Sequence, residues 1–360
     1  MNNKHILVIE DSSKNTFGGG QKISLLILSF LKGTHKVTLF DTNRKSKFHK
    51  EAKPFINNFF ILFKYGSSRS GVVGFLMKFL EYTLFPFLLV LNLALIFIKT
   101  RVFDEKLVYA TTKKSLVIAY FFKLFFNIDF IYHAHLVETN YYSKVLISFI
   151  LKKSKSVISV SNVVQKSISA KNNIVIYNPI KSDVNLKGKS LNKRIVVAVF
   201  ASLIKIKGID YFLRSHRYLN TGKDVEYWVF GEGVEINSLI KYKSENVIFK
   251  GFTDSVIDEM KENVDILCFP TIIEEACPVT ILEAFSCGIP VISTDIGGQA
   301  ELTTDGYNGY LVPIKNELKI AEKISELING DNYNLFSINA IITARKYNFN
   351  EFKNKLETIF

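Results

Sequence analysis

Cysteine is scarce in this 360-residue chain, which contains only Cys268, Cys277 and Cys287 and no Cys-x-x-Cys pair. Three thiols cannot pair evenly, and the ligand spacing of a zinc site is missing. The sequence therefore predicts neither a disulfide framework nor a zinc site, and it indicates a reducing, cytoplasmic compartment. Because 48% of the residues are hydrophobic and 22% are charged, disordered and collagen-like proteins are excluded as well.

Acidic residues are scarce in the first half of the chain. Residues 1–180 contain 9 Asp and Glu against 25 Lys and Arg, a net charge of +16, whereas residues 181–360 contain 24 against 21, a net charge of −3. Such asymmetry predicts an anionic partner for the first half: a membrane surface, a nucleic acid or an acidic substrate. Nucleic acid is the least favoured, because the lysines are scattered among Leu and Phe and no nucleic-acid-binding motif occurs.

A long apolar run is also missing. The longest uncharged stretch, residues 82–98, has 17 residues and is interrupted by Pro86 and Asn92. A membrane-spanning helix needs about 20 predominantly apolar residues. We therefore expect a buried helix or one that lies in a membrane interface. The apolar run at residues 5–10 is too short for a signal peptide and predicts a first strand.

Short β-rich runs alternate with helical runs along the whole chain, a pattern that predicts parallel α/β sheets. In the first half, strands are expected at 5–10, 36–41, 107–111, 129–133, 156–160 and 174–177. In the second half they are expected at 194–200, 225–230, 247–252, 265–269 and 291–294, with helices at 209–220 and 278–287 between them. The fold class is thus α/β, with two doubly wound parallel-sheet, Rossmann-like domains that face one another.

The domain boundaries follow from a polar, proline-marked stretch after residue 178. We expect a basic first domain over residues 1–180, a linker over 181–193 and a second domain over 194–335. A carboxy-terminal helix over 336–360 is expected to pack back on the first domain.

Two loops carry residues suited to phosphate. Gly18, Gly19 and Gly20 stand between the first strand and a helix that begins near Gln21, where backbone N–H groups can approach an anion. The spacing is not that of a Gly-x-Gly-x-x-Gly dinucleotide site. In the second half, Lys205 and Lys207 stand at a helix entry, where their charge could meet a pyrophosphate. The alternative for the glycine segment is a flexible loop without a ligand. The alternative for Lys205 and Lys207 is two solvated lysines on the surface.

The segment from Glu275 to Pro290 carries the most information. Pro278 suits the first position of a helix and Gly288 its end, so Glu275 is expected in the loop before the helix and Glu283 in its second turn. The N–H groups of Val279 and Thr280 would be free to bind an anion. Carboxylates beside such a helix end suit hydroxyl-rich ligands such as a sugar and a ribose. An ordinary exposed acidic loop is the alternative.

His133 and His135 stand two residues apart at the end of an apolar strand, and the alternation of a strand places both imidazoles on one face. A metal would need a third ligand, and only Glu138 is near in sequence. Hydrogen bonding to a ligand is therefore favoured over metal binding. The alternative is a purely structural role, in which a histidine at the strand end forms its hydrogen bonds within the protein.

Together these motifs resemble the retaining family-4 glycosyltransferases of GT-B fold, nearly from end to end. The family's signature of two glutamates separated by seven residues is similar to Glu275 and Glu283, with the run from Glu283 to Val291 as its tail. Weaker matches, in the same order as in the family, are Gly18-Gly19, His135 (His133 second), Lys207-Gly208, Asn178-Pro179, Gly231-Glu232-Gly233, Gly297-Gly298 with Glu301, and the run from Asp305 to Gly309.

The chain departs from the family pattern at two positions. Ser202 stands where the family usually has an arginine, which puts the affinity for the donor phosphate in question, although Lys205 is a candidate replacement. Ala276 stands where a glycine often follows the first glutamate. Ser202, Ala276, Cys277 and His133 are therefore site residues of second choice.

The resemblance implies a nucleotide diphosphate sugar as donor, with a UDP-sugar favoured over a GDP-sugar. Glu275 and His135 would act at the sugar, and Glu283 would accept from the ribose. Lys207, Lys205, the Val279 and Thr280 amides, and Gly18 and Gly19 would hold the diphosphate. No Asp-x-Asp motif occurs, so neither metal nor cofactor is expected.

The family also implies that the first domain receives the acceptor. A lipid-linked saccharide would explain the basic, apolar first domain. We therefore expect an enzyme of bacterial surface polysaccharide synthesis (capsule, lipopolysaccharide O-antigen or similar), peripheral on the inner face of the plasma membrane. The alternatives are a nucleotide-sugar epimerase of GT-B architecture and a degenerate, non-catalytic sugar-nucleotide-binding protein.

Overall fold

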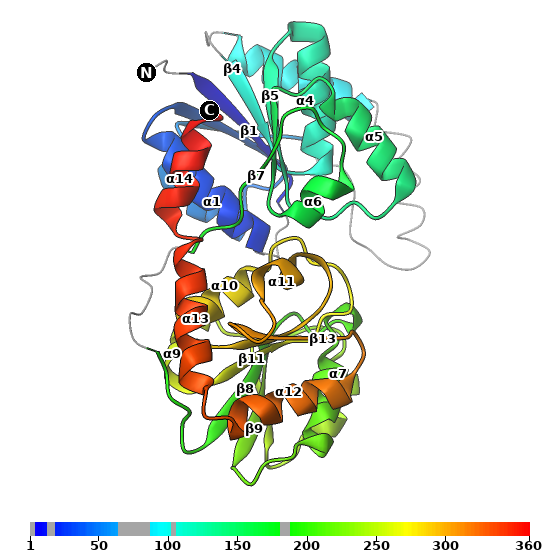
Figure 1. Cartoon of the computed structure of the whole chain (residues 1–360). Coiled ribbons are helices and arrows are strands. Elements are labelled where there is room, and N and C mark those ends of the chain that lie inside the picture. Colours follow the sequence, from blue (N-terminus) through cyan, green and yellow to red (C-terminus); the bar gives the residue numbers. More distant parts are fainter. Residues whose placement is uncertain (1–3, 13–18, 64–86, 102–105, 181–187) are drawn as a thin grey trace. The chain divides into compact units, whose positions relative to one another are not determined.

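The computed structural model describes residues 4–12, 19–63, 87–101, 106–180 and 188–360 (Figure 1). It divides into two compact units. The first comprises Met1–Val160 and Val164–Ile176, and the second comprises Ser161–Val163 and Tyr177–Phe360. Residues 181–187 of the expected linker and residues 82–86 of the long uncharged stretch lie outside the described residues.

The first unit is built on a seven-stranded parallel sheet of order β3-β2-β1-β4-β5-β6-β7. Its strands are β1 (His5–Glu10), β2 (Lys36–Asp41), β3 (Asn58–Ile61), β4 (Lys106–Ala110), β5 (Asp129–Ala134), β6 (Ser156–Ser159) and β7 (Asn173–Val175). The inner strands are short apolar runs whose residues are buried on both faces, as parallel strands between helical layers require.

The helices of the first unit connect successive strands. They are α1 (Gly19–Lys32), α2 (Lys47–Ala52) with a 3₁₀ turn at Lys53–Phe55, residues 87–100, α4 (Lys113–Phe126), α5 (Tyr141–Leu151) and α6 (Asn162–Ser167), of which Asn162 and Val163 belong to the second unit. Local signals fix α4: Thr112 and Ser115 form a reciprocal capping box at its start, and Asn127 ends it in the left-handed conformation, with φ 52°. Among the described residues, no helix is long and apolar enough to cross a membrane.

The second unit is built on a six-stranded parallel sheet of order β10-β9-β8-β11-β12-β13. Its strands are β8 (Ile195–Phe200), β9 (Val225–Phe230), β10 (Val247–Gly251), β11 (Ile266–Phe269), β12 (Val291–Thr294) and β13 (Gly309–Val312). Phe212 stacks on Tyr227 at 4.4 Å in the core beneath this sheet.

Eight α-helices belong to the second unit in the described part of the chain, and α7, α9, α10, α11, α12 and α13 lie around its sheet in Figure 1. They are α7 (Ile209–Ser215), α8 (Ile236–Leu239), α9 (Val256–Asn263), α10 (Val279–Ser286), α11 (Gly297–Leu302), α12 (Glu317–Asn329), α13 (Tyr333–Arg345) and α14 (Phe349–Glu357). Single 3₁₀ turns lie at Lys205–Lys207, His216–Tyr218 and Ile240–Tyr242.

The structure confirms the predicted fold class and each predicted strand to within a few residues. The edge strands β3 and β13 were not predicted. The helix expected at 209–220 ends at Ser215 and continues as the 3₁₀ turn. The single helix expected over 336–360 is wrong, because α13 and α14 are separate helices; α13 packs on α10 within the second unit.

Candidate functional site

The second sheet brings Lys207 and Glu275 together. The strand order reverses between β8 and β11, and ligands of such sheets bind beyond the carboxyl ends of the strands at this point. The loop after β8 carries Lys207, and the loop after β11 carries Glu275. The Lys207 Nζ donates to Glu275 Oε1 in an ion pair, and both side chains remain about one-fifth exposed, at 22% and 23%. The pair is therefore accessible to a ligand that carries both anionic and hydroxyl groups.

Hydrogen bonds to the Ile206 carbonyl hold these two loops against each other. Ile206 O accepts from Ile272 N at 2.9 Å and from Thr271 Oγ1 at 3.0 Å. Gly208 follows Lys207 with φ 63°, and a Cβ at this position would lie 2.1 Å from Pro270 O. Only glycine allows the chain to turn into α7 this close to the neighbouring loop, which explains the Lys207-Gly208 pair.

The Glu275 backbone is fixed by α11, a contact that the sequence analysis did not identify. Gln299 is fully buried; its Oε1 accepts from Glu275 N at 3.0 Å and its Nε2 donates to Ile273 O at 3.0 Å. Gly298 N donates to Glu275 O at 2.7 Å. These three hydrogen bonds hold the backbone of the loop and do not involve the Glu275 carboxylate. The carboxylate therefore keeps its contact with Lys207 and can accept hydrogen bonds from a ligand.

We expect Gly298→Ala to destabilise the second unit and displace the Glu275 loop. A Cβ at Gly298 would lie 1.9 Å from Ala276 O, a backbone atom that cannot move aside on its own. Overpacking of this kind costs about 1–3 kcal/mol. Chemical unfolding measures the loss. Gly222→Ala is the control, because a Cβ there meets no atom within 4 Å; equal stability of the two variants would contradict the packing argument.

Helix α10 begins as the sequence predicted, with one correction. Pro278 is the residue before the helix and not its first helical residue, so Val279 and Thr280 are the first two positions. The first intrahelical hydrogen bond runs from Ile281 N to Pro278 O, which leaves the Val279 and Thr280 N–H groups at the open helix end. Glu283 lies in the second turn and is partly exposed. Gly288, with φ 71°, follows the end of the helix as expected.

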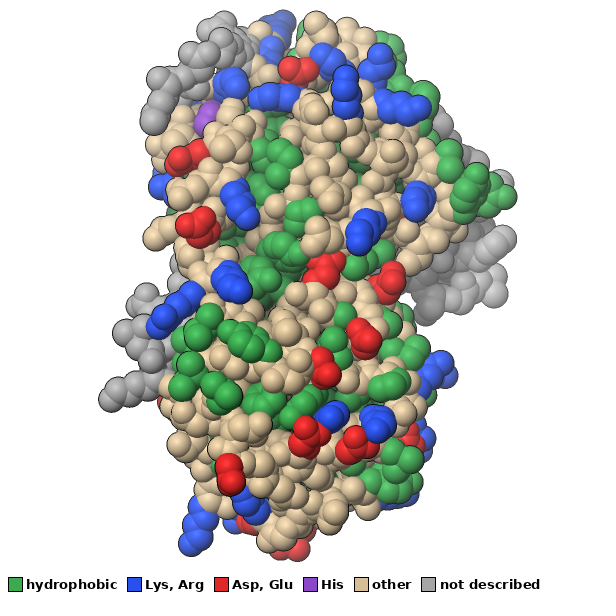
Figure 2. All heavy atoms as spheres, in the orientation of Figure 1, with side chains coloured by type: hydrophobic (Ala, Val, Ile, Leu, Met, Phe, Trp, Pro, Cys, Tyr) green, Lys and Arg blue, Asp and Glu red, His purple; other side chains and the backbone are tan. Residues whose placement is uncertain are grey.

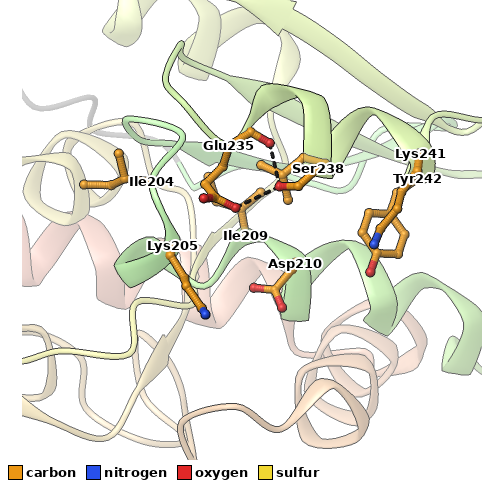
Figure 3. Close-up of a pocket in the computed structure, with 9 residues that line it drawn as sticks. Ile204, Lys205, Ile209, Asp210, Glu235, Ser238, Lys241 and Tyr242 are labelled. Carbon is orange, nitrogen blue, oxygen red and sulfur yellow. Dashed lines mark hydrogen bonds between the residues drawn. The ribbon is translucent and has the colours of Figure 1, made fainter. Parts of the chain in front are cut away.

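Lys205 lies apart from the Lys207–Glu275 pair. It lines a separate pocket of about 200 Å³ in the second unit (Figure 3). Lys241, Asp210 and Glu235 also line it, and Ser238 Oγ donates to Glu235 Oε2 at 2.8 Å. Two lysines and two carboxylates balance, so this pocket lacks the net positive charge that would attract a diphosphate. Lys205 is therefore a weaker candidate than Lys207 for phosphate binding.

The second-choice residues of this unit lie around the same loops. Ser202 is exposed after β8, and the Gly231–Gly233 loop packs tightly against its neighbours: a Cβ at Gly231 would lie 1.9 Å from Ala201 O. Cys277 is buried, and burial raises the pKa of its thiol to about 12, so it stays protonated and cannot serve as a nucleophile at neutral pH. The Cys277 carbonyl accepts from Asn178 Nδ2 at 2.9 Å.

The first unit brings His133, His135 and the glycine segment together. The imidazole rings of the two histidines lie 3.9 Å apart, and a Cβ at Gly20 would lie 3.9 Å from His135 Cγ. Tyr109 Oη lies 2.6 Å from His133 Nδ1. Neither His133 Nε2 nor His135 Nε2 has a hydrogen-bond partner among the described residues. Gly19 is the first residue of α1, and Gly18 lies outside the described residues.

Both histidines are neutral at physiological pH. Burial lowers the pKa of His135 to about 4. The pKa of His133 is lowered well below its ordinary value, first by burial and then by the neighbouring His135. A neutral imidazole with an unpaired Nε2 can donate or accept a single hydrogen bond. In the part of the chain that the structure describes, no three His, Cys, Asp or Glu side chains lie together in a group that could hold a metal ion.

Two further acidic residues are committed to internal contacts that sequence patterns do not reveal. Glu301 of α11 accepts from Val163 N at 2.5 Å, from Asn162 N at 2.9 Å and from Tyr177 Oη at 2.7 Å, so it caps the start of α6. Glu10, at the end of β1, is buried and accepts from Thr111 Oγ1 at 2.8 Å. For Glu301 and Gln299, the sequence signal was the Gly297-Gly298 motif, which stands at the start of α11.

The second unit matches a known family. Residues 194–330 match the model of the glycosyl transferases group 1 family. A Campylobacter jejuni N,N'-diacetylbacillosaminyl-diphospho-undecaprenol alpha-1,3-N-acetylgalactosaminyltransferase is 29% identical over 175 residues, 47% of this chain and 45% of that protein. The Staphylococcus aureus capsular polysaccharide biosynthesis glycosyltransferase CapM is 29% identical over 151 residues, 40% and 39% of the two chains. The aligned part of the chain thus spans less than half the length of these relatives.

Solved structures match nearly the whole chain. The Anabaena protein Alr3699/HepE, solved in complex with UDP, has a TM-score of 0.80 at 19% identity and 98% coverage of both chains. A glycosyltransferase from Rickettsia africae has a TM-score of 0.80 at 18% identity, with 100% and 98% covered. At this identity the likeness shows the fold. The chain therefore has the GT-B fold, and its residues 194–330 match the model of the glycosyl transferases group 1 family.

Proposed function

We propose that this chain is a retaining, metal-independent glycosyltransferase. It transfers a sugar from a nucleotide diphosphate sugar, UDP-linked in preference to GDP-linked, to a hydroxyl of a lipid-linked saccharide in the synthesis of a bacterial surface polysaccharide. The observation that carries the proposal is the Lys207–Glu275 pair at the switch point of the second sheet, beside the start of α10.

In this proposal, cationic and N–H groups bind the diphosphate, and carboxylates bind hydroxyl groups. Lys207 and the Val279 and Thr280 amides face the diphosphate and stabilise the charge that grows on it as the sugar–phosphate bond breaks. Glu275 accepts hydrogen bonds from hydroxyls of the donor sugar, and Glu283 accepts from the ribose. In the first unit, the neutral His135 offers one hydrogen bond to the sugar. The departing diphosphate takes the proton of the acceptor hydroxyl, so no protein base is required.

The comparisons support the choice of substrates. The Alr3699/HepE structures contain UDP, and one contains UDP-glucose. The Campylobacter relative is named for transfer to a sugar on diphospho-undecaprenol, and CapM for capsular polysaccharide synthesis. A lipid-linked acceptor would place the enzyme on the cytoplasmic face of the plasma membrane.

A donor screen tests the proposal. Purified full-length protein is incubated with a panel of UDP- and GDP-sugars, with and without a bacterial membrane lipid extract, and nucleoside diphosphate release is measured. We expect release from a UDP-sugar that depends on the lipid extract. Interconversion of a donor sugar without acceptor would instead show an epimerase, and nucleotide binding without turnover of any donor would show a degenerate binding protein.

A further inference from the structure

One face of the first unit exposes apolar side chains over a continuous helical layer. The helix at residues 87–100, α4 and α5 form this layer. Phe97 stacks on Phe126 at 4.3 Å, which joins the first helix to α4, and Tyr120 lies 6.2 Å from Phe149, which joins α4 to α5. Right-handed connections between parallel strands place all three helices on the same face of the sheet.

The outward side of α5 is the most exposed part of the layer. Ile147, Ile150 and Leu151 of α5 are buried, whereas the opposite side of the helix is apolar and exposed. Its exposed residues are Tyr141, Tyr142, Val145, Leu146 and Phe149, each more than half exposed. Hydrophobic side chains gather at the edge of the unit where α5 lies, with Lys and Arg beside them (Figures 1 and 2).

The other two helices extend this apolar surface. Phe87, Val90 and Ile98 are exposed on residues 87–100, and Leu124 and Phe125 are exposed on α4. By contrast, α1 and α2 expose no large hydrophobic side chain among the described residues. Apolar exposure is therefore concentrated on one helical layer, which marks it as an interaction surface.

The charge of the layer identifies the partner. None of the three helices contains an Asp or Glu, whereas they contain Lys99, Lys113, Lys114, Lys123 and Lys144. Lys152 and Lys153 follow α5 directly. Lys144, Lys152 and Lys153 are exposed and form no ion pair with any described residue. Aromatic and aliphatic side chains beside unpaired lysines suit a bilayer surface with anionic headgroups.

We propose that the α5 face of this layer is the surface by which the protein docks on an anionic lipid bilayer. Tyr141, Tyr142, Val145, Leu146 and Phe149 enter the boundary between headgroups and acyl chains, and Lys144, Lys152 and Lys153 contact lipid phosphates. The inference deepens the proposed function, because a lipid-linked acceptor would be reached from this surface. Docking itself requires neither donor nor acceptor.

Vesicle co-sedimentation tests this assignment. Full-length protein is mixed with vesicles of phosphatidylcholine alone or with about one-third phosphatidylglycerol. We expect binding to the anionic vesicles only. The double variant Leu146→Ser/Phe149→Ser should lower the partition coefficient at least tenfold, because both residues lose apolar contact with the bilayer. Replacing Lys144, Lys152 and Lys153 by Gln should lower it about fivefold per lysine.

Leu318→Ser is the matched control, because Leu318 is as exposed as Leu146, at 56%, but lies on α12 of the second unit, where Lys319 and Lys323 form ion pairs with Glu322 and Glu326. It should leave vesicle binding unchanged. UDP affinity, measured on the same variants, should also stay unchanged, which separates a failure of docking from a failure of the donor site or of folding.

Three outcomes would overturn the proposal. The first is that wild-type protein does not bind anionic vesicles. The second is that the Leu146→Ser/Phe149→Ser variant binds as well as wild type, so that docking occurs elsewhere on the chain. The third is that the same variant converts a dimer to a monomer in sedimentation velocity without changing vesicle binding, which would make this face a contact between two copies.

Discussion

Glu275→Gln is expected to lower kcat/KM for sugar transfer by about two to three orders of magnitude, the loss typical of one preorganised electrostatic contact in an active site. The substitution keeps the shape of the side chain and removes its charge. The backbone of the loop should not move, because Gln299 and Gly298 hold Glu275 through its N–H and carbonyl groups. The substitution should therefore lower kcat and leave the free energy of unfolding nearly unchanged.

The partner of Glu275 should respond differently. Lys207→Met removes the cation that the proposal places at the diphosphate, so we expect weaker UDP binding, by about tenfold or more, as well as slower transfer. Glu275→Gln should leave UDP affinity unchanged or raise it, because the ion pair then no longer competes for Lys207. Isothermal titration with UDP and initial rates with the donor identified by the screen separate the two effects.

Glu274→Gln is the matched control for Glu275. It is the neighbouring carboxylate, it is exposed, and it has no part in the Lys207 contact. Its rate should stay within about twofold of wild type. If the Glu274 and Glu275 variants had equal rates, the ion pair would be a structural contact only, and the proposed role of Glu275 would be wrong.

Much of the second-unit site could be predicted because it depends on local signals. A strand end followed by Lys207-Gly208, and a second strand end followed by Glu275 and a helix start, are both readable from spacing. The sheet topology alone then places these two loops side by side. Pro278 was misplaced by one position, which is the usual uncertainty at a helix start.

The contacts that hold the loops could not be predicted in the same way. Gln299 acts on Glu275 only because Gly298 lets α11 approach the Ala276 carbonyl, and that approach depends on tertiary packing. The edge strands β3 and β13 were missed for a related reason. A four-residue strand carries too little periodic signal, and its pairing with β2 or β12 is what makes it a strand. The sequence also could not distinguish Lys205 from Lys207. Both are lysines in the same short turn, yet Lys207 contacts Glu275 and Lys205 lines another pocket.

The polar residues at the ends of the strands of the first sheet were equally hard to predict, and they contribute to the pH dependence of stability. Burial raises the pKa of Glu10 to about 7, with the nearby Asp41 adding to the rise and the Thr111 hydrogen bond opposing it. Burial lowers the pKa of His135 to about 4 and lowers that of His133. The two kinds of group act in opposite directions.

The sign for each follows from which state binds more protons. Glu10 is protonated more readily in the folded state, so its stabilisation is complete below about pH 4.5 and is lost as the pH rises through about 7. The histidines are protonated more readily in the unfolded state, so their contribution is complete above about pH 6.5 and is lost as the pH falls toward 4. We therefore expect the combined contribution of these three groups to stability to be greatest near pH 6.5.

Glu10→Gln isolates the first of these effects. Gln keeps an oxygen to accept from Thr111 and cannot ionise, so the variant should not lose stability as the pH rises. Relative to wild type, its free energy of unfolding should increase by about 3 kcal/mol between pH 4.5 and 8, the value of a pKa difference of about 2.5. Urea unfolding at a series of pH values measures this difference.

Two further variants make the experiment decisive. Glu51→Gln removes an exposed carboxylate from α2 of the same unit, and its difference from wild type should stay constant across the same range. His135→Gln should show the reverse of Glu10→Gln, gaining on wild type as the pH falls from 6.5 to 4. If the Glu10 variant gave a difference independent of pH, the carboxyl would be ionised in the folded state at pH 5 to 7, and the end of β1 would carry a buried negative charge beside Asp41 that some cation must balance.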